Sequence, residues 1–245
     1  MAASESTKYL RESVETAVRS GFYKQAELLD DLGERIADEI DDDADVAAVE
    51  RELTAYAKKL LAAQREAEAK WTKPTMNDRI DAAFAQLKRE GIIALQNAGY
   101  TMSNGWEDAN EAAHRMDPPA RGATFYHGQD LERGVKNQGL MLAFGAYVKS
   151  GDNEQQSVAL GKDICATLAR YGVPTKWNGS VDSRIEIPKF KWQRRQFTKA
   201  PKVEPVAPKA NAKPKPNANA KPNAKPKPKP KPNAKPKRST RASRR

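Results

Sequence analysis

The residues best suited to chemistry stand together in one short run, Tyr126-His127-Gly128-Gln129-Asp130. The run ends a β-rich stretch and precedes a short predicted helix. Polar side chains at the carboxyl end of a strand are where open α/β sheets often bind ligands. All members of the run except the glycine are therefore candidate ligand-binding residues. The alternative is structural, with Asp130 capping the helix and His127 hydrogen-bonded in the interior.

Trp106 is a further candidate, because it lies next to a loop rich in glycine and asparagine. The loop spans residues 97–105, and a helix is predicted from Trp106 to Met116, before a pair of prolines. Ser103 or Asn104 could cap this helix. The sequence leaves open whether the indole ring of Trp106 binds a ligand or packs in the core.

Metal and redox chemistry have little support in the composition. The chain has two histidines and one cysteine, Cys165. Their positions do not follow the spacing of a transition-metal site, and a single cysteine excludes an intramolecular disulfide. The sequence therefore predicts no metal and no cofactor, and it singles out no catalytic residue.

Charge is distributed very unevenly along the chain. The 245 residues carry a net charge of +11, with 43 Lys and Arg against 32 Asp and Glu. Residues 199–245 hold 16 of the basic residues, one acid and 11 of the 16 prolines, so they carry +15 and the preceding residues carry −4. A segment of this composition buries too little apolar surface to fold. It predicts a disordered basic tail.

Such a tail can neutralise phosphates at many positions without reading bases. Just before it, residues 189–197 interleave cations with aromatic rings, which could stack on bases or seal the last strand. The candidate nucleic-acid-binding residues are Arg194, Arg195, Lys213, Lys215, Lys221, Lys225, Lys227, Lys229, Lys231, Lys235, Lys237, Arg238, Arg241, Arg244 and Arg245. The alternatives are a solubilising tail, or one that contacts acidic protein surfaces.

The folded part divides into two regions by charge and pattern. Residues 1–70 have an excess of acids and apolar residues at helical spacing, which predicts an acidic helical module. One apolar stripe runs from Leu28 to Ile40 and another from Val46 to Leu61. We expect these stripes to face each other, and the acidic module to be a candidate docking face for a protein partner.

Residues 71–198 alternate between helical and β-rich patterns, which predicts an α+β domain with a small mixed sheet and packed helices. A helix is expected over residues 75–90. The order that follows it is β-α-β-α-β-α-β-β, with strands near residues 92–96, 124–127, 140–147, 174–177 and 184–188.

No apolar run approaches the roughly 18 residues that a membrane span requires, and the first residues lack the apolar core of a signal peptide. We therefore expect neither a membrane location nor classical secretion. The cytoplasm is the expected location, with association with the nucleoid as a further option.

Five motifs, taken in order, resemble a bacterial, mostly actinobacterial, cytosolic domain family of unknown function. They begin at Asp78 (DRIDAAF), Gly91 (GIIALQN), Phe125 (FYHGQD), Gly139 (GLMLAFG) and Trp192 (WQRR). The resemblance covers about residues 10–195 and implies no particular activity. The Lys/Pro/Ala-rich tail lies outside it and resembles the tails of linker histones and of some actinobacterial nucleoid proteins.

We therefore expect a non-enzymatic binding protein whose tail contacts DNA or RNA without sequence specificity. The first alternative is an enzyme or small-ligand domain that uses His127, Gln129 and Asp130. The second is a protein interaction module that binds through the acidic helices.

Overall fold

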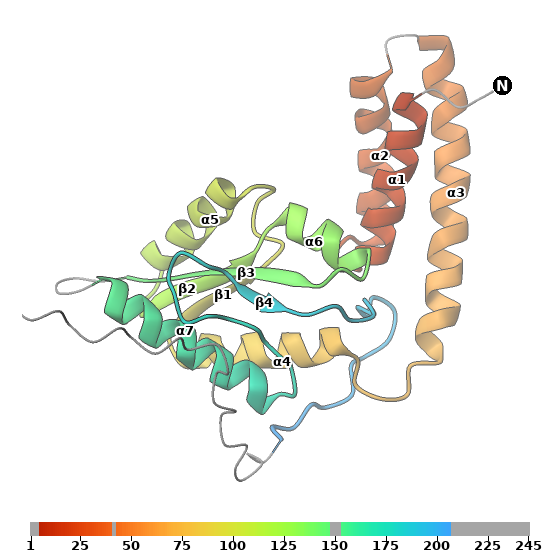
Figure 1. The fold of residues 1–245 in the computed structure, drawn as a ribbon. Coiled ribbons are helices and arrows are strands. Elements are labelled where there is room, and N and C mark those ends of the chain that lie inside the picture. The colour runs from red at the N-terminus through yellow and green to blue at the C-terminus, as the bar shows by residue number, and fades with distance from the viewer. Residues whose placement is uncertain (1–4, 41–42, 148–152, 207–245) are drawn as a thin grey trace, which may run out of the picture. The chain divides into compact units, whose positions relative to one another are not determined.

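The computed structural model describes residues 5–40, 43–147 and 153–206. They belong to one compact unit that extends to Pro208. The predicted nucleic-acid-binding residues from Lys213 onward lie outside the described residues. Within the described ranges the chain forms seven helices and a four-stranded mixed sheet (Figure 1), which confirms the predicted α+β class.

The N-terminal region is a bundle of three helices, α1 (Glu5–Ser20), α2 (Gln25–Glu39) and α3 (Asp43–Ala69). One buried cluster takes an apolar stripe from each helix: Leu10, Val14 and Val18 from α1, Leu28, Leu32 and Ile36 from α2, and Leu53, Ala57 and Leu61 from α3. The two predicted stripes do pack together. A third stripe, on α1, completes the bundle and is not one of the two predicted stripes.

The sheet has the strand order β1 (Ile92–Gln96), β2 (Gly122–Tyr126), β3 (Leu140–Ala146) and β4 (Ile185–Ile187). β1 and β2 are parallel, whereas β3 runs antiparallel to both of its neighbours. The strand predicted over residues 174–177 is wrong, because only Lys176 forms an isolated bridge, to Glu186. Pro174 lacks the backbone N–H that a ladder needs.

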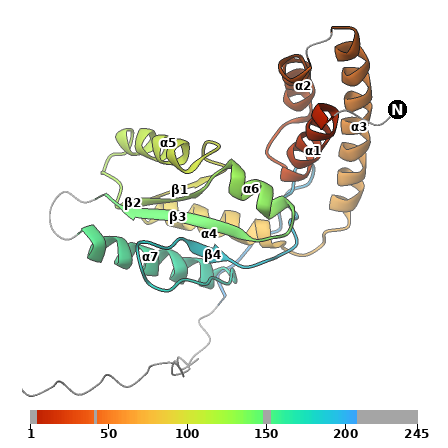
Figure 2. The same cartoon turned by 45° about the horizontal axis from the view of Figure 1, so that its top comes forward.

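Helices cover both faces of the sheet. α4 (Met76–Arg89) and α7 (Asn153–Arg170) lie on one face and α5 (Met102–His114) lies on the other, as both views show (Figures 1 and 2). α6 (Gly128–Val135) follows β2 directly, and its Leu131 and Val135 join the core of α4 and α7. The loop after β1 meets the end of β2 at the start of α6.

Helix α5 begins earlier than the predicted start at Trp106. Its N-cap is Thr101, whose hydroxyl accepts a hydrogen bond from the backbone amide of Asn104, while the Asn104 side chain accepts one from the amide of Thr101. This capping box satisfies two amides that the helix leaves unpaired. Ser103 and Asn104, the predicted caps, therefore lie inside the first turn.

The residues that the structure describes after β4, 188–206, form no helix or strand, yet they stay part of the folded unit. We call residues 192–198 the strap, because they contact both the bundle and α4. Trp192 is buried and its indole N–H donates to the carbonyl of Ser20 (3.3 Å). Farther on, Val203 packs against the core and the amide of Val206 donates to the carbonyl of Arg170 (2.6 Å). The folded part therefore continues past residue 199.

Candidate functional site

His127 lies where strand β2 passes directly into helix α6, and it is the N-cap of that helix. The loop after β1 accepts hydrogen bonds from the next two backbone amides. Gly128 N donates to Gly99 O (2.9 Å), and Gln129 N donates to Tyr100 O (3.2 Å). A Cβ atom at Gly128 would lie 2.7 Å from Tyr100 Cδ2. Glycine is therefore needed for the ends of the two parallel strands to approach this closely.

Asp130 lies one turn farther along α6 and turns its carboxylate back onto His127. Its Oδ2 atom is 3.1 Å from His127 Nε2 and 2.8 Å from Arg184 Nη1. The side chains of His127 and Asp130 are 5% and 2% exposed, whereas the side chain of Arg184 is 33% exposed. We call these three residues the His127 cluster. The buried carboxylate needs both partners, because an unpaired charge is costly to remove from water.

The imidazole of His127 favours its neutral form. Burial lowers the pKa of His127, the Asp130 carboxylate opposes that shift, and the Arg184 guanidinium reinforces it. A neutral ring that donates Nε2–H to Asp130 leaves a lone pair on Nδ1. This nitrogen has no hydrogen-bond partner in the part of the chain that the structure describes. It could accept a proton or a hydrogen bond, as a general base does.

Two other predicted ligand-binding residues, Tyr126 and Trp106, pack against the core. Tyr126 packs toward α4, and its hydroxyl donates to Gln96 Oε1 (2.9 Å). The ring of Trp106 packs edge-on against a phenylalanine of β2, with centroids 5.1 Å apart. Gln129, by contrast, is exposed at the start of α6.

Arg184 is the member of the His127 cluster that the sequence analysis missed. It lies 54 positions from Asp130, just before the short strand β4. No motif surrounds it, and its contact depends on the pairing of β4 with β3. The position of Arg184 next to Asp130 could be predicted only from the correct sheet topology.

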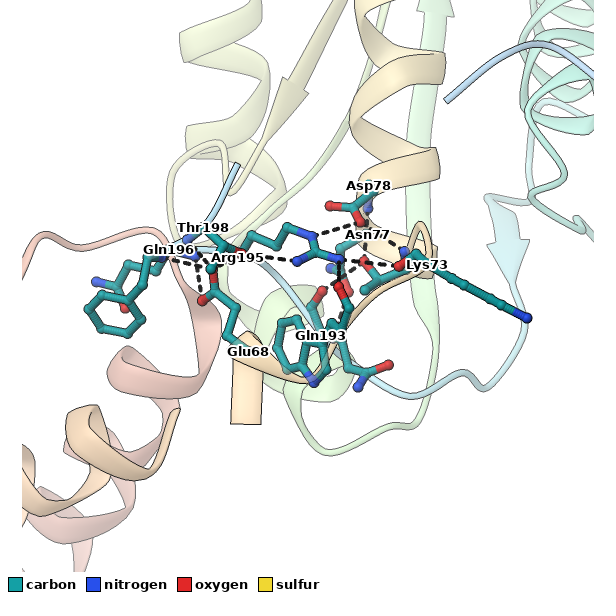
Figure 3. A network of polar contacts seen from close by, with 11 residues as sticks. Glu68, Lys73, Asn77, Asp78, Gln193, Arg195, Gln196 and Thr198 are labelled. Atoms are coloured by element: carbon teal, nitrogen blue, oxygen red, sulfur yellow. Dashed lines mark hydrogen bonds and ion pairs between the residues drawn. The ribbon is translucent and has the colours of Figure 1, made fainter. Parts of the chain in front are cut away.

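The two arginines predicted to extend the charge of the tail are engaged inside the fold, and Figure 3 shows the second of them. Arg195 Nε lies 3.1 Å from Asp78 Oδ2, and Arg195 Nη2 donates to the carbonyls of Trp71 (2.7 Å) and Lys73 (3.1 Å). Asp78 also accepts the backbone amide of Thr75 (2.8 Å). The side chains of Arg195 and Asp78 are 6% and 3% exposed, so this ion pair is buried.

Arg194 makes a matching contact one turn farther along α4. Its Nη1 atom lies 2.7 Å from Asp81 Oδ1 and 3.2 Å from Gln96 Oε1, and its guanidinium lies over the ring of Phe22. The motifs that begin at Asp78 and Trp192 are thus joined by two ion pairs. Nucleic-acid binding by these two arginines stays a prediction, and the observed contacts are internal to the fold.

Glu68, at the end of α3, holds the rest of the strap (Figure 3). It is 1% exposed, and its carboxylate accepts the backbone amides of Gln196 and Phe197 (both 2.9 Å) and the hydroxyl of Thr198 (2.7 Å). Charge-assisted hydrogen bonds of this kind are among the stronger ones. No pattern in the sequence indicates this role, because Glu68 is one acid among many in an acidic helix.

The described ranges hold no group of three or more His, Cys, Asp or Glu side chains arranged to bind a metal ion. No helix in them is both long enough and apolar enough to cross a membrane.

Comparison with known proteins identifies the family. A family model described as a domain of unknown function, DUF6891, matches residues 3–196. No curated protein and no solved structure matches the chain. The matched residues include the bundle, the sheet, the His127 cluster and most of the strap, while the Lys/Pro-rich segment lies outside them. The chain therefore belongs to the DUF6891 family of domains of unknown function.

Proposed function

We propose that this protein is a non-enzymatic binding protein that contacts DNA or RNA without sequence specificity through residues 199–245. The observation that carries the proposal is the charge of +15 on a segment that has one acid and no aromatic residue. Lysine and arginine side chains release condensed counterions from phosphates, and this release supplies affinity without base contacts.

The charge of the preceding residues supports this division of roles. They carry −4, and their last two arginines, Arg194 and Arg195, are paired with Asp81 and Asp78. A polyanion is repelled by a net negative charge and gains little from cations that are already paired. The attraction must therefore come from the later lysines and arginines.

A chain that ends at Pro208 separates the tail from the folded unit. It keeps every contact described above, including that of Val206 with Arg170. We expect the full chain to bind a short duplex of arbitrary sequence in a fluorescence anisotropy titration, and the shortened chain not to bind. If six to ten phosphates are contacted, affinity should fall by about 10³- to 10⁵-fold between 50 and 200 mM salt.

The matched control is a full chain whose tail lysines and arginines are replaced by glutamine, which keeps the length and removes the charge. It should bind no better than the shortened chain. A parallel titration with single-stranded RNA distinguishes the two classes of nucleic acid. Equal binding by the full and shortened chains, or binding that does not respond to salt, would overturn the proposal.

The same proposal places the protein in the cytoplasm of a bacterium, in contact with its nucleic acid. A fluorescent fusion of the full chain should then follow the nucleoid if DNA is the partner. The fusion that ends at Pro208 should spread evenly through the cell.

The unpartnered Nδ1 atom of His127 favours a second function, that of a small-ligand site. A ligand hydroxyl or amine that enters the interior could donate to this buried nitrogen. Arg184 of the His127 cluster and Gln129, both partly or fully exposed, are the polar side chains of the same region that solvent reaches. A thermal-shift screen of nucleotides, sugars, amino acids and metal ions tests this function. A ligand that raises the melting temperature of the wild type and not of His127→Phe supports it, and no shift with any compound contradicts it.

A further inference from the structure

A cleft of about 560 Å³ lies between the bundle and the carboxyl ends of β1 and β2. Its walls are α1 and α2 on one side, and the loop after β1 together with α6 on the other. We call it the bundle–sheet cleft. Its volume falls within the range of roughly 300–1,000 Å³ that is usual for ligand sites. His127 does not line it, so it is separate from the His127 cluster.

The loop after β1 is shaped to present a side chain to this cleft. Asn97 and Gly99 both have left-handed backbones, with φ of 53° and 52°. A Cβ atom at Gly99 would lie 2.3 Å from Asn104 Cβ, so only glycine fits there. The turn leaves Tyr100 on the wall of the cleft, 56% exposed. Ligands of open α/β sheets bind at this edge, beyond the carboxyl ends of the strands.

A second tyrosine lines the opposite wall. Tyr9 of α1 is 59% exposed, and Tyr9, Tyr100 and Val206 are the large apolar side chains that the described residues leave exposed. Burial raises the pKa of the Tyr100 hydroxyl, and Glu132 and Tyr9 raise it further. Exposed aromatic rings on both walls are suited to stacking with flat, apolar or cationic groups.

The charge of the cleft is negative. Four carboxylates line it, from Glu12, Asp38, Glu39 and Glu132, against two cations, Arg35 and Lys136. Arg35 donates to Ser13 Oγ (3.2 Å), and Glu132 accepts the hydroxyl of Tyr100 (3.1 Å). The other three carboxylates are exposed and form no ion pair with any residue that the structure describes. The cleft therefore suits a ligand that brings several positive charges.

We propose that the bundle–sheet cleft binds an extended lysine- and proline-rich peptide segment of a partner protein. Aromatic-lined grooves recognise proline-rich chains in the polyproline II conformation, and carboxylates pair with lysine. That conformation has three residues per turn and a rise of about 3.1 Å per residue. A peptide in which lysine and proline alternate can therefore place rings against the tyrosines and ammonium groups near the carboxylates together. The proposal gives the acidic helices a definite docking face and does not depend on nucleic-acid binding.

The probe is a labelled peptide of alternating lysine and proline, the sequence of residues 225–232. It is titrated into the chain that ends at Pro208, so that the probe supplies the only such repeat. We expect saturable binding that weakens as salt is added. A glutamate–proline peptide of equal length should not bind. A lysine–alanine peptide should bind roughly two- to tenfold more weakly, because it lacks the rings.

Two variants locate the binding in the cleft. Tyr9→Ala should weaken binding of the lysine–proline peptide roughly two- to fivefold, and the double variant Asp38→Asn/Glu39→Gln should weaken it and reduce its dependence on salt. The matched control, Glu107→Gln/Asp108→Asn, removes two exposed carboxylates from α5, outside the cleft. Each of three outcomes would overturn the proposal: no binding, equal binding of the lysine–alanine peptide, or equal losses in the α5 variant.

Discussion

Two buried carboxylates, Asp78 and Asp130, each hold an arginine, and the clusters around them differ in how fully their polar atoms are used. Around Asp78, backbone carbonyls and amides complete the ion pair with Arg195. Around Asp130, the partner His127 keeps a ring nitrogen with no partner among the described residues. A saturated cluster holds chain segments together, whereas an unsaturated one leaves a buried polar atom that only a group entering the interior can pair.

The largest effect should come from breaking the saturated cluster. Arg195→Met leaves the Asp78 carboxylate buried without its countercharge, which typically costs about 3–5 kcal/mol of unfolding free energy. Urea unfolding of the full chain measures this loss. Lys191→Met, at an exposed position just before the strap, is the matched control and should change stability by less than about 0.5 kcal/mol. Similar values for the two variants would contradict a special role for the Arg195 pair.

A substitution at Glu68 tests the contacts that the strap makes with the bundle. Glu68→Gln removes the charge that binds the strap amides and adds an N–H₂ group where donors already point, so we expect a loss of about 1.5–3 kcal/mol. Glu66→Gln removes an exposed charge from the same helix and should be nearly neutral. Thermal unfolding monitored by circular dichroism compares them. If Glu68→Gln is as stable as Glu66→Gln, the strap does not depend on this carboxylate.

The unsaturated cluster should respond to pH. Because the pKa of His127 is lowered in the folded state, the unfolded chain binds the proton more readily. Stability is therefore full above about pH 6.5 and falls as the pH drops through the folded pKa, by at most about 1.4 kcal/mol per pH unit. Unfolding of the wild type and His127→Phe across this window gives the difference. A difference that stays constant with pH would show that His127 does not titrate in this way.

The smallest effect belongs to an ion pair outside both clusters. Arg121 and Asp163 pair at 2.5 Å, but both side chains are about half exposed, at 51% and 48%. Asp163→Asn should cost no more than about 1 kcal/mol, and less at high salt. Stability measured at low and high salt checks this. A loss comparable to that of Arg195→Met would remove burial as the reason for the difference between the pairs.

The sequence predicted the helices and strands of the sheet region well, because their apolar spacing decides which face is buried. The start of α4 is set by the capping box of Thr75 and Asp78, and its end is followed by Gly91, which has a positive φ. Two predictions were wrong: residues 174–177 do not form a strand, and α5 begins at Met102 and not at Trp106. In the second case the capping hydroxyl of Thr101 overrode the loop composition around it.

The candidate site was predictable only in part. His127 and Asp130 are three positions apart, so their contact follows from one strand end and one helix turn. Arg184 and Glu68 act through contacts that span more than fifty positions, and neither stands in a distinctive pattern. For Arg194 and Arg195 the residue types suggested a solvent-facing cationic surface, whereas packing of the strap on α4 gave both of them internal partners.

The strap also sets an order in time. Arg195 follows Asp78 by 117 positions, and Thr198 follows Glu68 by 130. During synthesis, the bundle, α4 and the sheet are all made before the strap. The carboxylates of Asp78 and Glu68 therefore lack these partners until the strap has been made. The contacts that the strap makes with the bundle and with α4 can therefore form only after residue 198 has been synthesised. After a proteolytic cut just before Trp192, these non-covalent contacts alone would hold the strap, whereas a cut after Pro208 would leave the strap covalently joined to the sheet.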